Sequence, residues 1–273
     1  MHQSARQLQA LVGGVVDLGP TNPLFALERA MGVTQHHDSV AGTAKEYVNK
    51  NYSGILEDGR QGAFASMAAS FGKSTGYGGA PFTFCPLANV TLCPALEAGT
   101  PTVVLAYNSL GQAVPNAPVR VAAGFPAGVA TYRVTDATGN PVVAQIVPLS
   151  ARDIALRSLY GGSTAPVQWL YFTGNLPAAG YSAFFLVPSA AVEDAPMTHA
   201  SALRVIAPQS GDSTITNGRI TLTISAATGF LSTYTDATTG ITLPLSQSWQ
   251  SYIGATNVTF NGSNQASGAY IFR

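Results

Sequence analysis

The stretch Gly76-Tyr77-Gly78-Gly79 separates two parts of the chain that follow different patterns. Before it, apolar residues recur at helical spacing, as at Leu24, Leu27 and Met31, so this part is predicted to be helical. After it, short β-rich runs such as residues 102–107 alternate with turns of Asn, Gly, Pro and Asp, which is typical of antiparallel strands. The chain is therefore expected to be an α+β protein in which helices precede sheets.

These patterns divide the chain into three expected domains. Residues 1–76 are expected to form a helical, three-helix-bundle-like segment, residues 77–202 an antiparallel β-sandwich, and residues 203–273 the beginning of a second β-sandwich. A sheet that stopped at residue 273 would leave an unpaired edge, which natural domains avoid. We therefore interpret the sequence as a multidomain fragment, truncated at both ends.

The composition narrows the possible functions. Only 10% of the 273 residues are charged and the formal net charge is zero, so there is no basic patch for a nucleic acid. Uncharged stretches such as residues 74–96 are interrupted by Gly, Pro and polar residues, and no membrane span is predicted. The first six residues do not form a signal-peptide pattern.

Residues 35–43, Gln-His-His-Asp-Ser-Val-Ala-Gly-Thr, combine metal-ligand and acid side chains. Neighbouring side chains point in different directions on a regular backbone, so we expect one ligand and one or two supporting groups among His36, His37 and Asp38. Zinc takes about four ligands, so a zinc site here would be incomplete within this chain. A polar helix cap is the alternative interpretation. Thr43 and Glu46 are expected to form a capping box for the next helix.

The two cysteines of the chain enclose a glycosylation sequon. Asn89-Val90-Thr91 lies between Cys85 and Cys93, although any single sequon in a Ser/Thr-rich chain can arise by chance. Further sequons begin at Asn51, Asn257 and Asn261. A disulfide across so short a loop would stabilise the fold by about 2.5 kcal/mol, and it persists only in an oxidising compartment. We therefore expect a protein of the secretory-pathway lumen, with its targeting signal outside this sequence.

Four landmarks, in this order, resemble the α-mannosidases of glycoside hydrolase family 38, most closely the lysosomal or acidic branch. They are residues 7–13 (Gln-Leu-Gln-Ala-Leu-Val-Gly), the His-His-Asp motif with its Gly-Thr, the cysteine loop at residues 84–94, and residues 265–273 (Gln-Ala-Ser-Gly-Ala-Tyr-Ile-Phe-Arg). The sequence departs from the family pattern at Ser39, Ala41 and Asn264.

The resemblance implies a zinc-dependent retaining hydrolase of terminal α-D-mannose in N-glycans and glycoproteins, located in the lysosome or an acidic vacuole, or secreted. His37 matches a zinc ligand of the family, Asp38 matches an acid that accepts hydrogen bonds from mannose hydroxyls, and Tyr270 matches a tyrosine that reaches into the pocket. The nucleophile, the acid/base and the remaining zinc ligands would lie upstream. No catalytic residue is therefore assigned in this chain, and the chain alone is expected to be inactive. Residues 203–273 match the start of the family's large C-terminal sandwich.

Two alternatives stay open at this point. His36 either orients His37 or its loop, or it simply packs against the protein. The chain as a whole is either part of such an α-mannosidase or a catalytically inert β-sandwich module that binds glycans or another protein.

Overall fold

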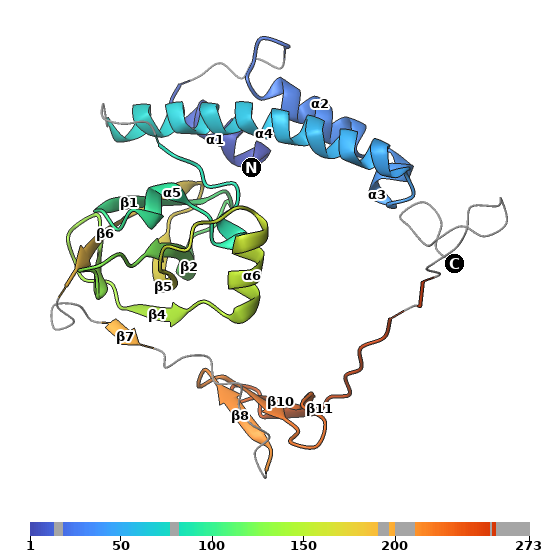
Figure 1. Ribbon diagram of the computed structural model, residues 1–273, viewed down its shortest axis with the longest axis vertical. Coiled ribbons are helices and arrows are strands. Elements are labelled where there is room, and N and C mark those ends of the chain that lie inside the picture. Colours follow the sequence, from blue (N-terminus) through green and yellow to red (C-terminus); the bar gives the residue numbers. More distant parts are fainter. Residues whose placement is uncertain (14–18, 77–81, 191–196, 200–210, 252, 255–273) are drawn as a thin grey trace. The chain divides into compact units, whose positions relative to one another are not determined.

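Helices precede antiparallel sheets along the chain, which confirms the expected α+β fold class (Figure 1). This computed structural model describes residues 1–13, 19–76, 82–190, 197–199, 211–251 and 253–254. The chain divides into two compact units, Met1–Leu203 and Arg204–Arg273. Both the helical segment and the first sheets lie within the first unit.

The helical segment contains α1 (His2–Leu11), α2 (Phe25–Val33), the short α3 (His37–Val40) and the 30-residue α4 (Glu46–Thr75). Its small core is made of buried apolar side chains from the first two helices, the loop before α2, and α4: Ala5, Leu24, Leu27 and Ala63. At Gly59 a Cβ atom would lie 2.5 Å from the Leu27 Cα, so the close crossing of α2 and α4 requires glycine there. α4 ends at Thr75. The next residue, Gly76, is its C-cap and has the left-handed conformation.

The first unit continues with two sheets. One has the order β1 (Thr102–Asn108), β6 (Gly180–Ser189), β3 (Thr131–Asp136), and the other has the order β2 (Val114–Gly124), β5 (Val167–Leu176), β4 (Ala144–Pro148), β7 (Met197–His199). All neighbouring strands are antiparallel except β4 and β7. Buried side chains of both sheets form one core, which includes Val134, Leu186, Ile146, Leu170 and Phe172.

Three short elements lie outside the strands of these sheets. They are the 3-10 helix η1 (Ala88–Val90), α5 (Pro94–Glu97) and α6 (Ala151–Leu159). A capping box at Ser150 and Asp153 begins α6, because the serine hydroxyl accepts from the Asp153 N–H and the carboxylate accepts from the Ser150 N–H.

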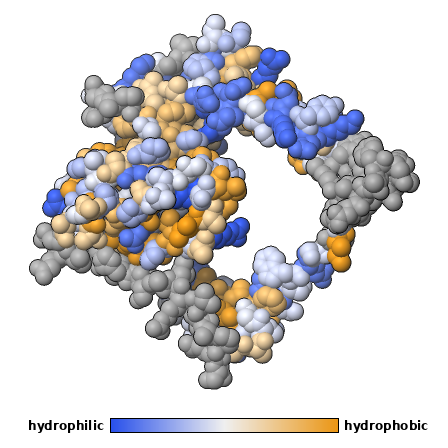
Figure 2. All heavy atoms as spheres, in the orientation of Figure 1, coloured by the Kyte–Doolittle hydropathy of each residue, from blue (hydrophilic) through white to orange (hydrophobic). Residues whose placement is uncertain are grey.

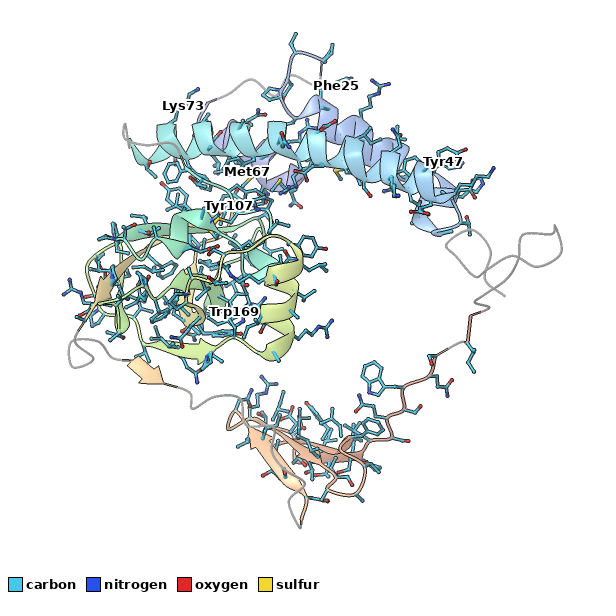
Figure 3. All side chains as sticks on the ribbon, viewed as in Figure 1. Phe25, Tyr47, Met67, Lys73, Tyr107 and Trp169 are labelled. Carbon is cyan, nitrogen blue, oxygen red and sulfur yellow. A yellow bond between two sulfur atoms is a disulfide. The ribbon has the colours of Figure 1, made fainter. Side chains whose placement is uncertain are left out.

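A small seam of aromatic and polar side chains joins the helical segment to the first sheet. Phe71 of α4 meets Tyr107 and Tyr181 edge-on, with ring centroids 6.2 and 5.5 Å apart. The Tyr107 hydroxyl donates to Gln7 Oε1 at 3.0 Å, and Gln7 Nε2 donates to the Ser109 carbonyl at 3.0 Å. The seam lies near the C-terminal end of α4. Tyr47 marks the opposite end of this helix, which is about 45 Å long at 1.5 Å per residue (Figure 3).

The second unit contains a four-stranded antiparallel sheet in the order β11 (Ile241–Pro244), β10 (Leu231–Asp236), β9 (Ile220–Ile224), β8 (Ser213–Thr216). Its register gives the sheet two different faces. Ile215, Leu222, Tyr234 and Leu243 share one face, whereas Thr216, Thr221, Thr235 and Thr242 share the other. No residue of these four strands is buried.

Among the described residues, no helix combines the length and the apolar character that crossing a bilayer requires.

Candidate metal centre

The His-His-Asp motif lies at a change of backbone conformation. α2 ends at Val33, and His36 is the N-cap of α3 with φ −51° and ψ 137°, so the chain is extended at His36 and helical from His37 onward. Metal-ligand atoms of His36, His37 and Asp38 all lie within 4.8 Å of one another. Three consecutive side chains diverge on a regular backbone, and the switch from extended to helical geometry at His36 lets these three converge.

Asp38 is the centre of the cluster. Its Oδ1 accepts a hydrogen bond from the Thr43 hydroxyl at 2.9 Å, and its Oδ2 lies 3.2 Å from His36 Nε2. The His37 Nε2 is 3.8 Å from Asp38 Oδ1. The Asp38 carbonyl also accepts from the backbone N–H groups of Thr43 and Ala44, at 3.0 and 3.1 Å. Local bonds within residues 36–44 therefore build the whole arrangement.

The expected capping box at Thr43 and Glu46 is wrong. α4 begins at Glu46 with Lys45 as its N-cap, and no side chain caps it. The Thr43 hydroxyl faces Asp38 instead, because Gly42, with φ +70°, turns the chain back toward α3. The residue that was expected to cap a helix therefore supports the candidate site.

The cluster is open to solvent and carries a charged acceptor. The side chains of His36 and Asp38 are 45% and 43% exposed, and that of His37 is 86% exposed. The hydrogen bond from Thr43, followed by that from His36, lowers the pKa of Asp38 below its usual value. At neutral pH Asp38 is a carboxylate that can only accept hydrogen bonds or bind a cation. Figure 2 shows the hydrophilic surface over α3 and the start of α4.

The donor set fits a borderline metal ion. Imidazole nitrogen and carboxylate oxygen are both ordinary zinc ligands, and a zinc site takes about four of them. Within the described ranges, these three residues are the only group of three or more His, Cys, Asp or Glu side chains close enough to hold an ion. The three side chains could therefore supply some, but not all, of the ligands that a zinc ion takes.

Some of the other predicted residues lie within the described ranges and some lie outside them. Cys85 and Cys93 form a disulfide with 5.1 Å between their Cα atoms, which confirms the predicted pairing. The sequon residues Asn89 and Asn51 are exposed, in η1 and α4 respectively. Three predicted residues lie outside the described residues: Tyr270, Asn257 and Asn261.

A second polar cluster, absent from the sequence predictions, holds the cysteine loop and α5 against α6. Arg157 of α6 is 4% exposed and donates to the Thr91 carbonyl, to the Glu97 carboxylate and to the Ser163 carbonyl. Glu97 also accepts from the Cys93 N–H at 3.0 Å. The partners are up to 66 residues apart, so no local pattern could have indicated the cluster.

Known proteins are similar to this chain over almost its whole length. A probable α-mannosidase of Arabidopsis thaliana is 31% identical over 292 residues, covering 100% of this chain and 27% of that protein. The lysosomal α-mannosidase of Homo sapiens is 31% identical over 275 residues, covering 99% and 25%. The chain is similar to one segment of each of these two α-mannosidases.

The chain spans about a quarter of the length of the curated relatives it matches. The α-mannosidase of Canavalia ensiformis is 31% identical over 269 residues, which is 91% of this chain and 26% of that protein. No protein-family profile matches the chain. A crystal structure of an α-mannosidase from Enterococcus faecalis V583 aligns with this chain at 16% identity and a TM-score of 0.46. The alignment covers 89% of this chain and 27% of the chain in the crystal structure.

Proposed function

We propose that this chain is part of a zinc-dependent retaining α-mannosidase that hydrolyses terminal α-D-mannose residues of N-glycans and glycoproteins. The observation that carries the proposal is the convergence of His36, His37 and Asp38 within 4.8 Å, in a chain homologous to α-mannosidases over almost its whole length. The disulfide and the exposed Asn89 sequon support a place in the secretory pathway: a lysosome, an acidic vacuole or the extracellular space.

Within this proposal His37 is the zinc ligand. Its imidazole is the most exposed of the three side chains and can be approached by an ion without breaking a bond between Asp38 and Thr43 or His36. A zinc ion bound there would contact mannose hydroxyls and help to stabilise the distorted sugar near an oxocarbenium-like transition state. Asp38 accepts hydrogen bonds from mannose hydroxyls, since its carboxylate is ionised at neutral pH and 43% exposed. Tyr270 is proposed as a further substrate contact.

The proposal assigns the nucleophile and the acid/base to sequence outside this chain. A retaining glycosidase needs two carboxyl groups about 5 to 5.5 Å apart.

The first test is a zinc and activity measurement on the longer polypeptide, if the reading frame continues upstream of Met1. We expect wild-type protein to contain zinc and to hydrolyse an aryl α-mannoside, and His37→Ala to lose both. His36→Ala, the matched control, should lose much less. The reverse result, in which His36→Ala empties the site and His37→Ala does not, would exchange the two roles and withdraw the role given to Asp38.

The second test uses the chain of residues 1–273 alone. It should show no turnover of aryl α-mannosides, because the proposal places both catalytic carboxyl groups outside it. Turnover that purifies with this chain, and that His37→Ala abolishes, would contradict that placement. An upstream stop codon preceded by a promoter would favour the alternative of an inert module that binds glycans or protein.

A further inference from the structure

The Asp38 carboxylate is held at both of its oxygens, by residues that precede and follow it in the chain. Thr43 donates its hydroxyl to Oδ1 at 2.9 Å, and His36 brings Nε2 to 3.2 Å from Oδ2. A half-exposed aspartate side chain normally samples several rotamers. Contacts to two different oxygens fix both the direction of the carboxylate and the rotation of its plane.

Backbone bonds hold Thr43 in place independently of its hydroxyl. The N–H groups of Thr43 and Ala44 both donate to the Asp38 carbonyl, at 3.0 and 3.1 Å, and close the turn that Gly42 makes possible with its φ of +70°. A Cβ atom on Gly42 would meet nothing within 4 Å, so this glycine is required for the conformation of the turn and not for space. The turn therefore presents the Thr43 hydroxyl to Asp38.

The same contacts give the two histidines different surroundings. His36 directs Nε2 to Asp38, whereas His37 is 86% exposed and its Nε2 is 3.8 Å from the nearest Asp38 oxygen. An ion that took His36 Nε2 as a ligand would compete with Asp38 for the same nitrogen. His36 is therefore better placed to hold Asp38 than to bind metal.

We propose that Thr43 and His36 are positioning residues that keep the Asp38 carboxylate in one orientation, so that a sugar hydroxyl meets a preorganised acceptor. The sugar-binding part of this inference rests on the proposed function, whereas the positioning of Asp38 does not. A fixed acceptor gains binding strength because less rotational freedom is lost when the ligand arrives.

The test measures the χ1 rotamer of Asp38 in the chain of residues 1–273, from NMR three-bond couplings. Wild type and Thr43→Ser keep the hydroxyl and should each show one dominant rotamer. Thr43→Val has nearly the same shape without the hydroxyl and should show averaged couplings. Slow exchange of the amide protons of residues 43 and 44 in the valine variant would show that the turn is intact.

When the turn stays intact in Thr43→Val, two results would overturn the inference: a single Asp38 rotamer in Thr43→Val, or averaging in Thr43→Ser as large as in Thr43→Val. If Thr43→Val also loses amide protection at residues 43 and 44, the Asp38 couplings are measured instead in His36→Ala. This variant keeps every backbone hydrogen bond of the turn. Averaged Asp38 couplings in that variant support the inference, and an unchanged rotamer overturns it.

A second arm applies to the longer polypeptide with mannosidase activity. Thr43→Val should lower kcat/KM by about tenfold, the scale of one hydrogen bond to a charged group, with zinc content unchanged. Thr43→Ser should restore most of the activity. Because the rotamer measurement requires neither zinc nor turnover, its failure would leave the proposed function standing. Fixed couplings in the chain of residues 1–273, together with a longer polypeptide that has neither zinc nor activity, would count against the proposed function alone.

Discussion

The carboxylates of Asp38 and Glu97 are both held by hydrogen-bond donors, yet their surroundings differ. Asp38 is held by Thr43 and His36 and is 43% exposed, whereas the Glu97 side chain is held by Arg157 and the Cys93 N–H and is 14% exposed. The partners of Asp38 lie within five residues, and Arg157 is 60 residues from Glu97. Exposed polar clusters contribute little to stability and remain available to ligands, whereas a buried ion pair cannot lose one partner without a large cost.

The largest effect on stability is expected from Arg157→Met. It leaves the Glu97 carboxylate without its cationic partner, and removing one member of a buried pair typically costs about 3 to 5 kcal/mol. Urea unfolding followed by circular dichroism measures this loss. Lys50→Met, which breaks the exposed pair with Glu46, is the control and should leave the unfolding transition where it is. Equal losses in the two variants would remove the distinction between buried and exposed polar clusters.

The next effect is expected from the joint substitution of Cys85→Ser and Cys93→Ser. Without the cross-link the unfolded chain regains the entropy of a short loop, and we expect a loss of about 2.5 kcal/mol on the chain-entropy estimate. Mass spectrometry of the non-reduced peptide from a secretory host should find the bridge in the wild type. Two free thiols there would contradict the lumenal location.

A third effect concerns pH. The hydrogen bond from Arg157, more than that from the Cys93 N–H, lowers the folded-state pKa of Glu97 below its unfolded value. The stabilisation is therefore present above the unfolded pKa and is lost as the pH falls through the lower, folded pKa. Unfolding midpoints measured from about pH 6 down to about pH 3, on either side of the ordinary glutamate range, should fall less steeply in Glu97→Gln than in wild type. If the unfolding midpoint fell equally steeply with pH in Glu97→Gln and in wild type, Glu97 would not be the cause of the loss of stability at low pH.

The smallest effect on stability is expected at the exposed cluster. His36→Ala and His37→Ala should each change the unfolding free energy by no more than about 0.5 kcal/mol, as surface substitutions usually do. Thermal unfolding in the presence of a chelator measures this without a contribution from bound metal. A loss of several kcal/mol in either variant would place the cluster among the structural elements of the fold.

Sequence patterns predicted those features that depend on neighbouring residues. Helical spacing around Leu24 and Leu27 and the β-rich runs after Gly76 predicted the fold class, and the short separation of Cys85 and Cys93 predicted their disulfide. The use of Thr43 was predicted wrongly. A threonine three residues before a glutamate fits a capping box, and the pattern does not contain the turn at Gly42 that directs the hydroxyl elsewhere.

By itself, the sequence determined three features: the order of helices before sheets, the cysteine pair, and a run of three side chains able to bind a metal or a sugar. Local patterns carry these because each depends on propensity and spacing over a few residues. Only the tertiary structure decided that His36, His37 and Asp38 converge, that Thr43 supports Asp38, and that Glu97 meets Arg157. These contacts depend on backbone angles at single residues and on packing between distant segments, neither of which a spacing rule contains.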